Sequence, residues 1–144
     1  MPGVMKSKPS PEELADFLKT QFPQNKTLIV AAGNMGATVK VNVGYADLRP
    51  GNTVSGPTSM ALADVALYVA ILAEIGIVPL AVTTSLSFNF LRKPKADRDL
   101  VGVCKLIKLG RTLAVGEVSI YSEGDSEPVA HAVGTYAIPK SGGG

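Results

Sequence analysis

The residues of this chain that could do chemistry lie in one short stretch, 55–64, which reads SGPTSMALAD. Gly56 stands where a helix would begin, and the free N–H groups of a first helical turn suit a developing oxyanion. Asp64 is a lone carboxylate eight residues further on and could act as a nucleophile or a general base. The same pattern also fits an ordinary helix start and a carboxylate that is exposed or accepts a structural hydrogen bond.

The spacing between Gly56 and Asp64 has a geometric consequence. At a rise of about 1.5 Å per residue, the two residues lie about 12 Å apart along one helix. They cannot both reach one carbonyl group, because a donor and a nucleophile must each lie within roughly 3 Å of it. Two antiparallel copies of the helix would bring Gly56 of one chain to Asp64 of the other. If these residues act together, the spacing therefore predicts a dimer.

A long helix must carry these residues. The run from about Pro57 to Glu74 is apolar on nearly every side, and Gly76 follows as a stop signal. Such a helix cannot lie on a flat sheet with its back in water. Either the sheet curls round the helix, or a second copy of the chain covers its back.

Four strand-like runs follow the helix, at 80–91, 100–109, 112–121 and 129–138. Short turns, LGRT and SEGDSEP, join the last three, which predicts an antiparallel sheet. One long apolar helix beside such a sheet indicates the α+β class, with the sheet wrapped on the helix.

The first third of the chain supplies the remaining elements. Ser10 and Glu13 form a capping-box pattern, which predicts a short amphipathic helix that ends at Pro23. Residues 27–45 alternate as two strands around a Gly-Asn turn. The Gly- and Pro-rich segment 46–57 reads as a loop.

Length and composition limit the class of protein. The 144 residues fit one domain, expected over 10–139 between a flexible N-terminus (1–9) and a flexible tail (140–144). The net charge of +2 does not suggest a nucleic-acid partner. The longest uninterrupted apolar run, 65–73, is too short to span a membrane, and the N-terminus lacks a signal-peptide pattern. We expect a soluble cytoplasmic protein.

Metal and redox chemistry find little support in the sequence. Cys104 is the one cysteine, so no internal disulfide can form, and it lies in an apolar strand as a buried filler. His131 is the one histidine, and its place in the last strand suggests a structural role. We expect no metal site.

Four segments together resemble a known family: SGPTSMALADVALYVAI, TTSLSFNFLRKP, LGRTLAVGEVSIYSEG and PVAHAVGTYAIP. They resemble the hotdog-fold acyl-CoA thioesterases of the phenylacetate-pathway and 4-hydroxybenzoyl-CoA type over about residues 38–139. The resemblance implies a long central helix wrapped by a curved antiparallel sheet of five to six strands, with a short N-terminal helix. It also implies a homodimer or dimer of dimers that hydrolyses acyl-CoA, with no cofactor beyond the coenzyme A of the substrate.

The resemblance also implies roles for single residues. Asp64 matches the family's nucleophile or general base, and Gly56 matches its oxyanion-hole glycine. Thr83, or Thr84 one residue later, matches a Ser or Thr that orients the attacking water or carboxylate. The expected substrate-binding residues are Ser55, Asn52, Thr84 and Arg49, and the expected residues for coenzyme A are Arg92, Lys93 and Arg111. Basic side chains suit its phosphates, although a short basic loop can also be merely solvated.

The chain departs from the family pattern at three positions. Ser55 replaces the motif histidine that helps to hold the thioester, and Pro57 replaces the second glycine. Arg49 stands where many members have asparagine, and it could attract an acidic acyl group or a phosphate, or be solvated. Two rival functions therefore stay open: a non-catalytic protein that binds acyl-CoA or an acyl carrier, and a hotdog hydratase. The hydratase needs a His and a carboxylate in one site, for which His131 is poorly placed.

Overall fold

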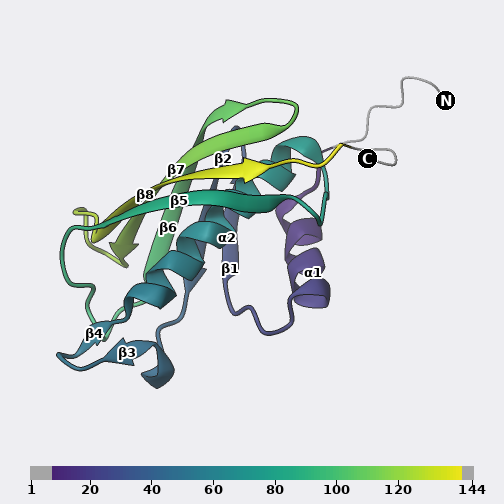
Figure 1. The fold of residues 1–144 in the computed structure, drawn as a ribbon. Helices are drawn as coiled ribbons and strands as arrows, with labels where there is room; N and C mark the ends of the chain where they lie inside the picture. Colours follow the sequence, from purple (N-terminus) through teal and green to yellow (C-terminus); the bar gives the residue numbers. More distant parts are fainter. Residues whose placement is uncertain (1–7, 141–144) are drawn as a thin grey trace.

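A computed structural model describes residues 8–140 of the chain. Its main sheet is antiparallel and six-stranded, in the order β1-β2-β6-β7-β8-β5. The strands are β1 (Leu28–Gly33), β2 (Gly36–Val41), β5 (Val82–Phe90), β6 (Leu100–Leu109), β7 (Leu113–Ser122) and β8 (Ala130–Ala137). Figure 1 shows the curved sheet around the long helix α2 (Gly56–Ile75), with the short helix α1 (Pro11–Gln21) beside it. The predicted architecture is confirmed; the flexible ends predicted for 1–9 and 140–144 lie outside the described residues, apart from 8, 9 and 140.

The helix α1 begins as its sequence predicts. The Glu13 N–H donates to Ser10 Oγ at 3.1 Å, and the Glu13 carboxylate accepts from the Ser10 N–H at 3.1 Å. This reciprocal pair satisfies two backbone donors that the first turn leaves free. The helix buries Leu14 and Leu18 against the core, and it ends at Gln21, two residues before Pro23.

The helix α2 forms the centre of the core. It begins at Gly56 with Ser55 as its N-cap, one residue earlier than predicted, and it ends at Ile75. Gly76 has a φ of 95°, a left-handed conformation that favours glycine, and its N–H donates to the Leu72 carbonyl. The helix is long and apolar enough to cross a membrane, but 61% of its most apolar window is buried inside the fold, as expected of a core helix.

Two paired glycines let the sheet approach α2 closely. Gly116 on β7 pairs with Gly134 on β8, and both lie beneath Leu67 of the helix. A Cβ on Gly134 would lie 2.5 Å from Leu67, and a Cβ on Gly116 would lie 2.7 Å from the same side chain. Since real Cβ contacts are longer than this, any larger residue at either position would force Leu67 or its surroundings to shift.

The predicted loop at 46–57 contains regular structure that the sequence analysis missed. A 3₁₀ turn at Tyr45–Asp47 leads into a small hairpin of β3 (Leu48–Arg49) and β4 (Thr53–Val54). These strands have two residues each, too few to produce a readable alternation. Thr53 Oγ1 donates to the Pro94 carbonyl at 2.9 Å, which fixes the hairpin to the segment that follows β5.

Two single residues occupy structural positions. Cys104 is buried, and its burial, together with the charge of Glu117, raises the pKa of the thiol to about 12. His131 lies on the outer face of the sheet, away from α2, with Nε2 3.0 Å from the Glu117 carboxylate. Both positions agree with the packing and structural roles that the sequence suggests.

Candidate active site

Asp64 is a half-buried residue of α2, and two hydroxyl groups hold it. Thr83 donates to Asp64 Oδ1 at 2.6 Å, and the Tyr136 hydroxyl donates to the same oxygen at 2.7 Å. Within residues 8–140, the second carboxylate oxygen accepts no hydrogen bond, and no cation pairs with Asp64. The carboxylate is therefore oriented through one oxygen, while its other oxygen remains available.

A bulge in β5 decides which threonine meets Asp64. The register of β5 on β8 shifts between Thr83 and Ser85, so Thr84 is the extra residue. Thr84 Oγ1 instead donates to the Thr135 carbonyl at 3.2 Å. Of the two threonines that the sequence left open, Thr83 is therefore the one that contacts the carboxylate.

Tyr136 is the site residue that the sequence analysis missed. It pairs directly with Thr83 across β5 and β8, although 72 residues separate it from Asp64 in the chain. Burial, and then the charge of Asp64, raise the pKa of its hydroxyl far above the ordinary value, so the group stays protonated and can donate. The sequence signal that could have identified Tyr136 is the alternation of β8, which buries Ala130, Ala132, Gly134 and Tyr136 on the helix side of the sheet.

Asp64, Thr83 and Tyr136 line a mainly apolar cavity of about 290 Å³, here called the Asp64 pocket. Its apolar walls include Leu18 of α1 and Phe22 just after it, together with Val65 and Tyr68 from α2 and Val82 from β5. The Phe22 and Tyr68 rings meet edge to face, with centroids 6.0 Å apart. The polar carboxylate thus opens into a space that suits an apolar group.

Gly56 lines a second cavity, of about 480 Å³, here called the Gly56 pocket. Its N–H is the first of α2 and makes no hydrogen bond within residues 8–140. Phe90 lies directly against it, so a Cβ at position 56 would be 3.2 Å from the ring. Arg49, Arg92 and Lys93 line the same cavity, which is therefore basic and has a free backbone donor.

The other predicted site residues have varied positions. Asn52 lies at the tip of the β3–β4 hairpin with a φ of 55°, and it lines a shallow cavity with Arg49 rather than the Gly56 pocket. The Ser55 hydroxyl contacts Thr58 Oγ1 at 3.0 Å. Arg111 lies in the β6–β7 turn, at the same end of the sheet as the start of β5, whereas Arg92 follows the end of β5. One chain therefore does not bring Arg111 to the other two basic residues.

The two pockets also lie apart within one chain. Thr83 is near the start of β5 and Phe90 at its end, a separation of about 23 Å along an extended strand. The two cavities share no lining residue. As the helical spacing predicts, one chain does not bring Gly56 and Asp64 to the same point.

Comparisons with known proteins agree on the family. The sequence model of the thioesterase superfamily matches residues 51–129. A proposed thioesterase from Silicibacter sp. TM1040 has a solved structure with 45% sequence identity and a TM-score of 0.85, covering 95% of this chain and 96% of that chain. A comparison with curated protein sequences found no match.

Two more distant structures share the fold. Zebra fish thioesterase superfamily member 2 has 19% identity and a TM-score of 0.80, covering 91% of this chain and 99% of that chain. The E. coli PaaI protein of the phenylacetic acid degradation operon has 20% identity and a TM-score of 0.79, covering 90% and 93%. These likenesses confirm the predicted hotdog fold. Because the family model matches more than half of the chain, and the 45% identical structure covers nearly all of it, the chain belongs to the thioesterase superfamily.

Proposed function

We propose that this protein is an acyl-CoA thioesterase that hydrolyses its substrate to a free acid and coenzyme A. The observation that carries the proposal is the environment of Asp64. Thr83 and Tyr136 hold one carboxylate oxygen, the other accepts no hydrogen bond within residues 8–140, and Asp64 lines a mainly apolar pocket. An oriented carboxylate with a free oxygen can activate a water molecule or attack a carbonyl group.

Two chemical routes are consistent with this geometry. As a general base, Asp64 takes a proton from water while the water oxygen attacks the thioester carbon, and the C–S bond then breaks so that coenzyme A leaves as the thiolate. As a nucleophile, Asp64 attacks that carbon itself, coenzyme A leaves as the thiolate, and water then cleaves the acyl-aspartyl anhydride. Both routes place negative charge on the carbonyl oxygen, which needs a donor such as the free Gly56 N–H.

A two-fold axis would supply that donor from a second copy. An axis midway between Gly56 and Asp64 passes near Met60, which is 39% exposed, and near the middle of β5. β5 is an edge strand with one unpaired side, and Val82 and Phe90 at its two ends are more than half exposed. Natural proteins usually cover such an edge. This axis would exchange the ends of β5 and place the partner's Gly56 at Asp64.

The basic residues suit the coenzyme A part of the substrate. Arg49, Arg92 and Lys93 line the Gly56 pocket, where their charges could bind phosphates. Arg92 also lies 3.5 Å from the Glu127 carboxylate, so part of its charge is already neutralised within the chain. The same two-fold axis would bring the partner's Arg111 to this end of β5.

The shared site can be tested by mixing two inactive variants. Asp64→Ala removes the carboxylate, and Gly56→Pro removes the N–H. Proline suits the first helical position, and Ser55 already has the extended backbone, with a ψ of 150°, that precedes proline. Each variant alone should release little thiol from a panel of acyl-CoAs. Co-expressed chains should recover about a quarter of the wild-type rate, because half of the dimers contain one intact site of two.

Gly56→Ala is the matched control, since it adds a methyl group near Phe90 but keeps the N–H. It should retain more activity than Gly56→Pro. Activity that does not recover in the mixture would contradict the shared site. A wild-type protein that binds acyl-CoA but hydrolyses none would instead be the non-catalytic binding protein.

A further inference from the structure

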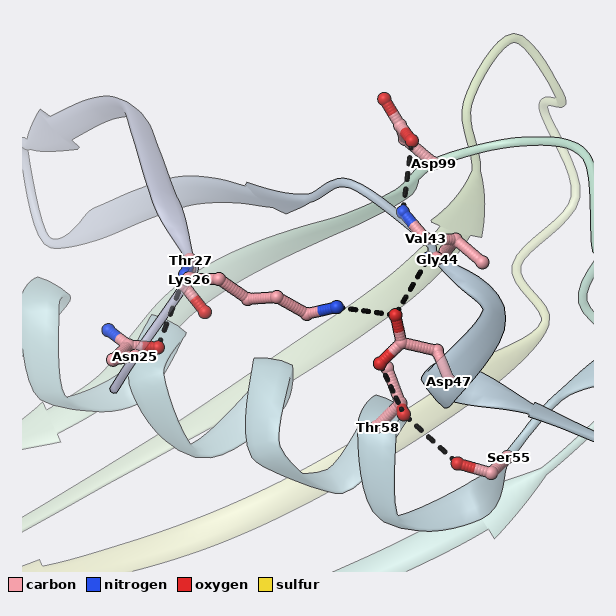
Figure 2. A network of polar contacts seen from close by, with 9 residues as sticks. All are labelled: Asn25, Lys26, Thr27, Val43, Gly44, Asp47, Ser55, Thr58 and Asp99. Atoms are coloured by element: carbon pink, nitrogen blue, oxygen red, sulfur yellow. Dashed lines mark hydrogen bonds and ion pairs between the residues drawn. The ribbon is translucent and has the colours of Figure 1, made fainter. Parts of the chain in front are cut away.

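A second carboxylate, Asp47, lies beside the first turn of α2 and takes no part in the chemistry proposed above. It is 7% exposed, and Figure 2 shows its side chain between three segments of the chain. One oxygen accepts from the Lys26 ammonium and from the Gly44 N–H at 2.8 Å. The other accepts from the Thr58 hydroxyl at 3.1 Å. A buried carboxylate with this many donors is a fixed point in the structure.

The donors and acceptors around Asp47 fix the direction of each hydrogen bond. Thr58 has one hydroxyl proton, and it donates that proton to Asp47. The 3.0 Å contact between Ser55 and Thr58 must therefore have Ser55 as its donor. The Ser55 N–H also donates to the Asp47 carbonyl, at 2.7 Å. Asp47 thus holds both the backbone and the side chain of the N-cap residue.

This arrangement replaces the usual cap of a helix. A serine N-cap normally accepts a hydrogen bond from a backbone N–H of the first turn, but the Ser55 side chain makes no such bond. Its hydroxyl is bound to Thr58 instead, on the side away from the Gly56 pocket. Gly56 lies between Ser55 and Thr58, so the orientation of its N–H depends on how these two neighbours are held.

The ammonium group of Lys26 balances the charge of Asp47. Burial alone would raise the pKa of its carboxyl, but the bonds from Lys26, Gly44 and Thr58 outweigh this and hold the pKa below the ordinary value. The group is therefore an anion at neutral pH. An anion near a helix N-terminus stabilises the helix but opposes a second negative charge nearby. The Lys26 ammonium offsets that repulsion.

We propose that Asp47 is a positioning residue for the reaction, and that the Lys26–Asp47–Thr58–Ser55 chain of hydrogen bonds fixes the direction of the Gly56 N–H. Asp47 acts through Ser55 and Thr58 and does not touch the substrate. The inference rests on the proposed function, in which the Gly56 N–H stabilises the oxyanion. It also gives Ser55 a role, since its hydroxyl is the last donor of this chain of hydrogen bonds.

Two variants of Thr58 test the proposal. Thr58→Val removes the hydroxyl at nearly constant shape, and Thr58→Ser keeps it. Thr58→Val should lower kcat about tenfold and change KM less than about twofold, because a misdirected N–H weakens only the transition state. Thr58→Ser should stay within about twofold of wild type. Asp47→Asn should lower kcat at least as much as Thr58→Val, since it disturbs the bonds from Lys26 and Gly44 as well.

Glu74 provides a matched control at the opposite end of α2. Its carboxylate also accepts from a lysine, Lys8 at 2.8 Å, and from a backbone N–H, that of Met35 at 2.9 Å. Glu74→Gln should lower the melting temperature and leave kcat unchanged. A Thr58→Val protein that is folded and dimeric, with the kcat of wild type, would overturn the proposal.

A spectroscopic measurement keeps this result separate from the proposed function. If wild type hydrolyses no acyl-CoA, the thioesterase proposal fails, and the amide signal of Gly56 still reports its position. Thr58→Val should then shift the ¹H–¹⁵N signal of Gly56, whereas Glu74→Gln should not. An unchanged Gly56 signal in Thr58→Val would overturn the positioning role.

Discussion

Two carboxylates lie along α2, and the structure holds them in opposite ways. Both oxygens of Asp47 accept hydrogen bonds, and Lys26 neutralises its charge. Asp64 accepts two hydrogen bonds on one oxygen, both from neutral hydroxyl groups, and its other oxygen accepts none within residues 8–140. The first arrangement leaves no carboxylate oxygen free, while the second leaves one oxygen free on a carboxylate that lines a mainly apolar pocket. The two side chains have the same chemistry, so the hydrogen-bond donors around each one decide whether it is structural, as at Asp47, or free to react, as at Asp64.

The largest effect should come from removing the charge of Asp64. In Asp64→Asn the amide oxygen can still accept from Thr83 and Tyr136, so the fold should change little. The amide can neither attack a carbonyl group nor take a proton from water, so thioester hydrolysis should fall at least about 100-fold. Thiol release from acyl-CoAs measures this loss.

The same substitution at Asp47 is the control for that experiment. Asp47→Asn should lose less activity than Asp64→Asn and more stability, since it breaks an ion pair and leaves donors without an acceptor. Thermal melting of both variants checks the second half of the comparison. If Asp64→Asn were as active as wild type, the distinction between the two carboxylates would have no chemical meaning.

A smaller effect should come from the donors of Asp64. Tyr136→Phe keeps the ring near Tyr68, with centroids 6.1 Å apart in the present structure, and removes the hydroxyl. One donor, Thr83, then remains to orient the carboxylate. We expect kcat to fall about tenfold, since a carboxylate held by one donor instead of two spends less time in the reactive geometry.

Thr83→Ser and Thr83→Val sharpen the test of orientation. The serine variant keeps a hydroxyl near Asp64 and should stay close to wild type, while the valine variant should resemble Tyr136→Phe. The double variant of Tyr136→Phe and Thr83→Val should lose more activity than either alone. If Tyr136→Phe, Thr83→Val and the double variant all kept the wild-type rate, the carboxylate of Asp64 would need no orientation by these hydroxyl groups.

The sequence alone predicted correctly those features that depend on residues close together in the chain. The capping box of α1 was read from adjacent residues, and β6 occupies the predicted range, Leu100–Leu109. The spacing of Gly56 and Asp64 was also local, because both lie on one helix of fixed rise. These predictions needed no knowledge of which strands pair.

The remaining parts of the site depend on pairing and could not be read in this way. Thr83 and Tyr136 meet because β5 pairs with β8, and the bulge at Thr84 sets the register between them. The sequence does not reveal this bulge, because the extra residue, Thr84, is of the same type as its neighbour Thr83. Asp47 lies in a segment that reads as a loop, and its partner Lys26 is 21 residues away. Its role becomes visible only once the chain is folded.

The smallest expected effect is a difference in how stability depends on pH. The folded pKa of Asp47 lies below its ordinary value of 3.8, because the bonds from Lys26, Gly44 and Thr58 outweigh the effect of burial. The folded state therefore favours the anion. Its stabilising contribution is complete above the ordinary pKa and is lost as the pH falls through the lowered one.

Asp47→Asn lacks this titration, so its free energy of unfolding should approach that of wild type as the solution becomes acidic. We expect the gap between the two proteins to shrink as the pH falls from neutral through the ordinary value of 3.8 and on through the lowered one. Urea unfolding at a series of pH values measures it. Glu74 and Asp125, whose pKa values are also lowered, titrate in both proteins and cancel in the difference. A gap that stays constant with pH would mean that Asp47 holds α2 by its shape and not by its charge, and Lys26 would then have no part in its role.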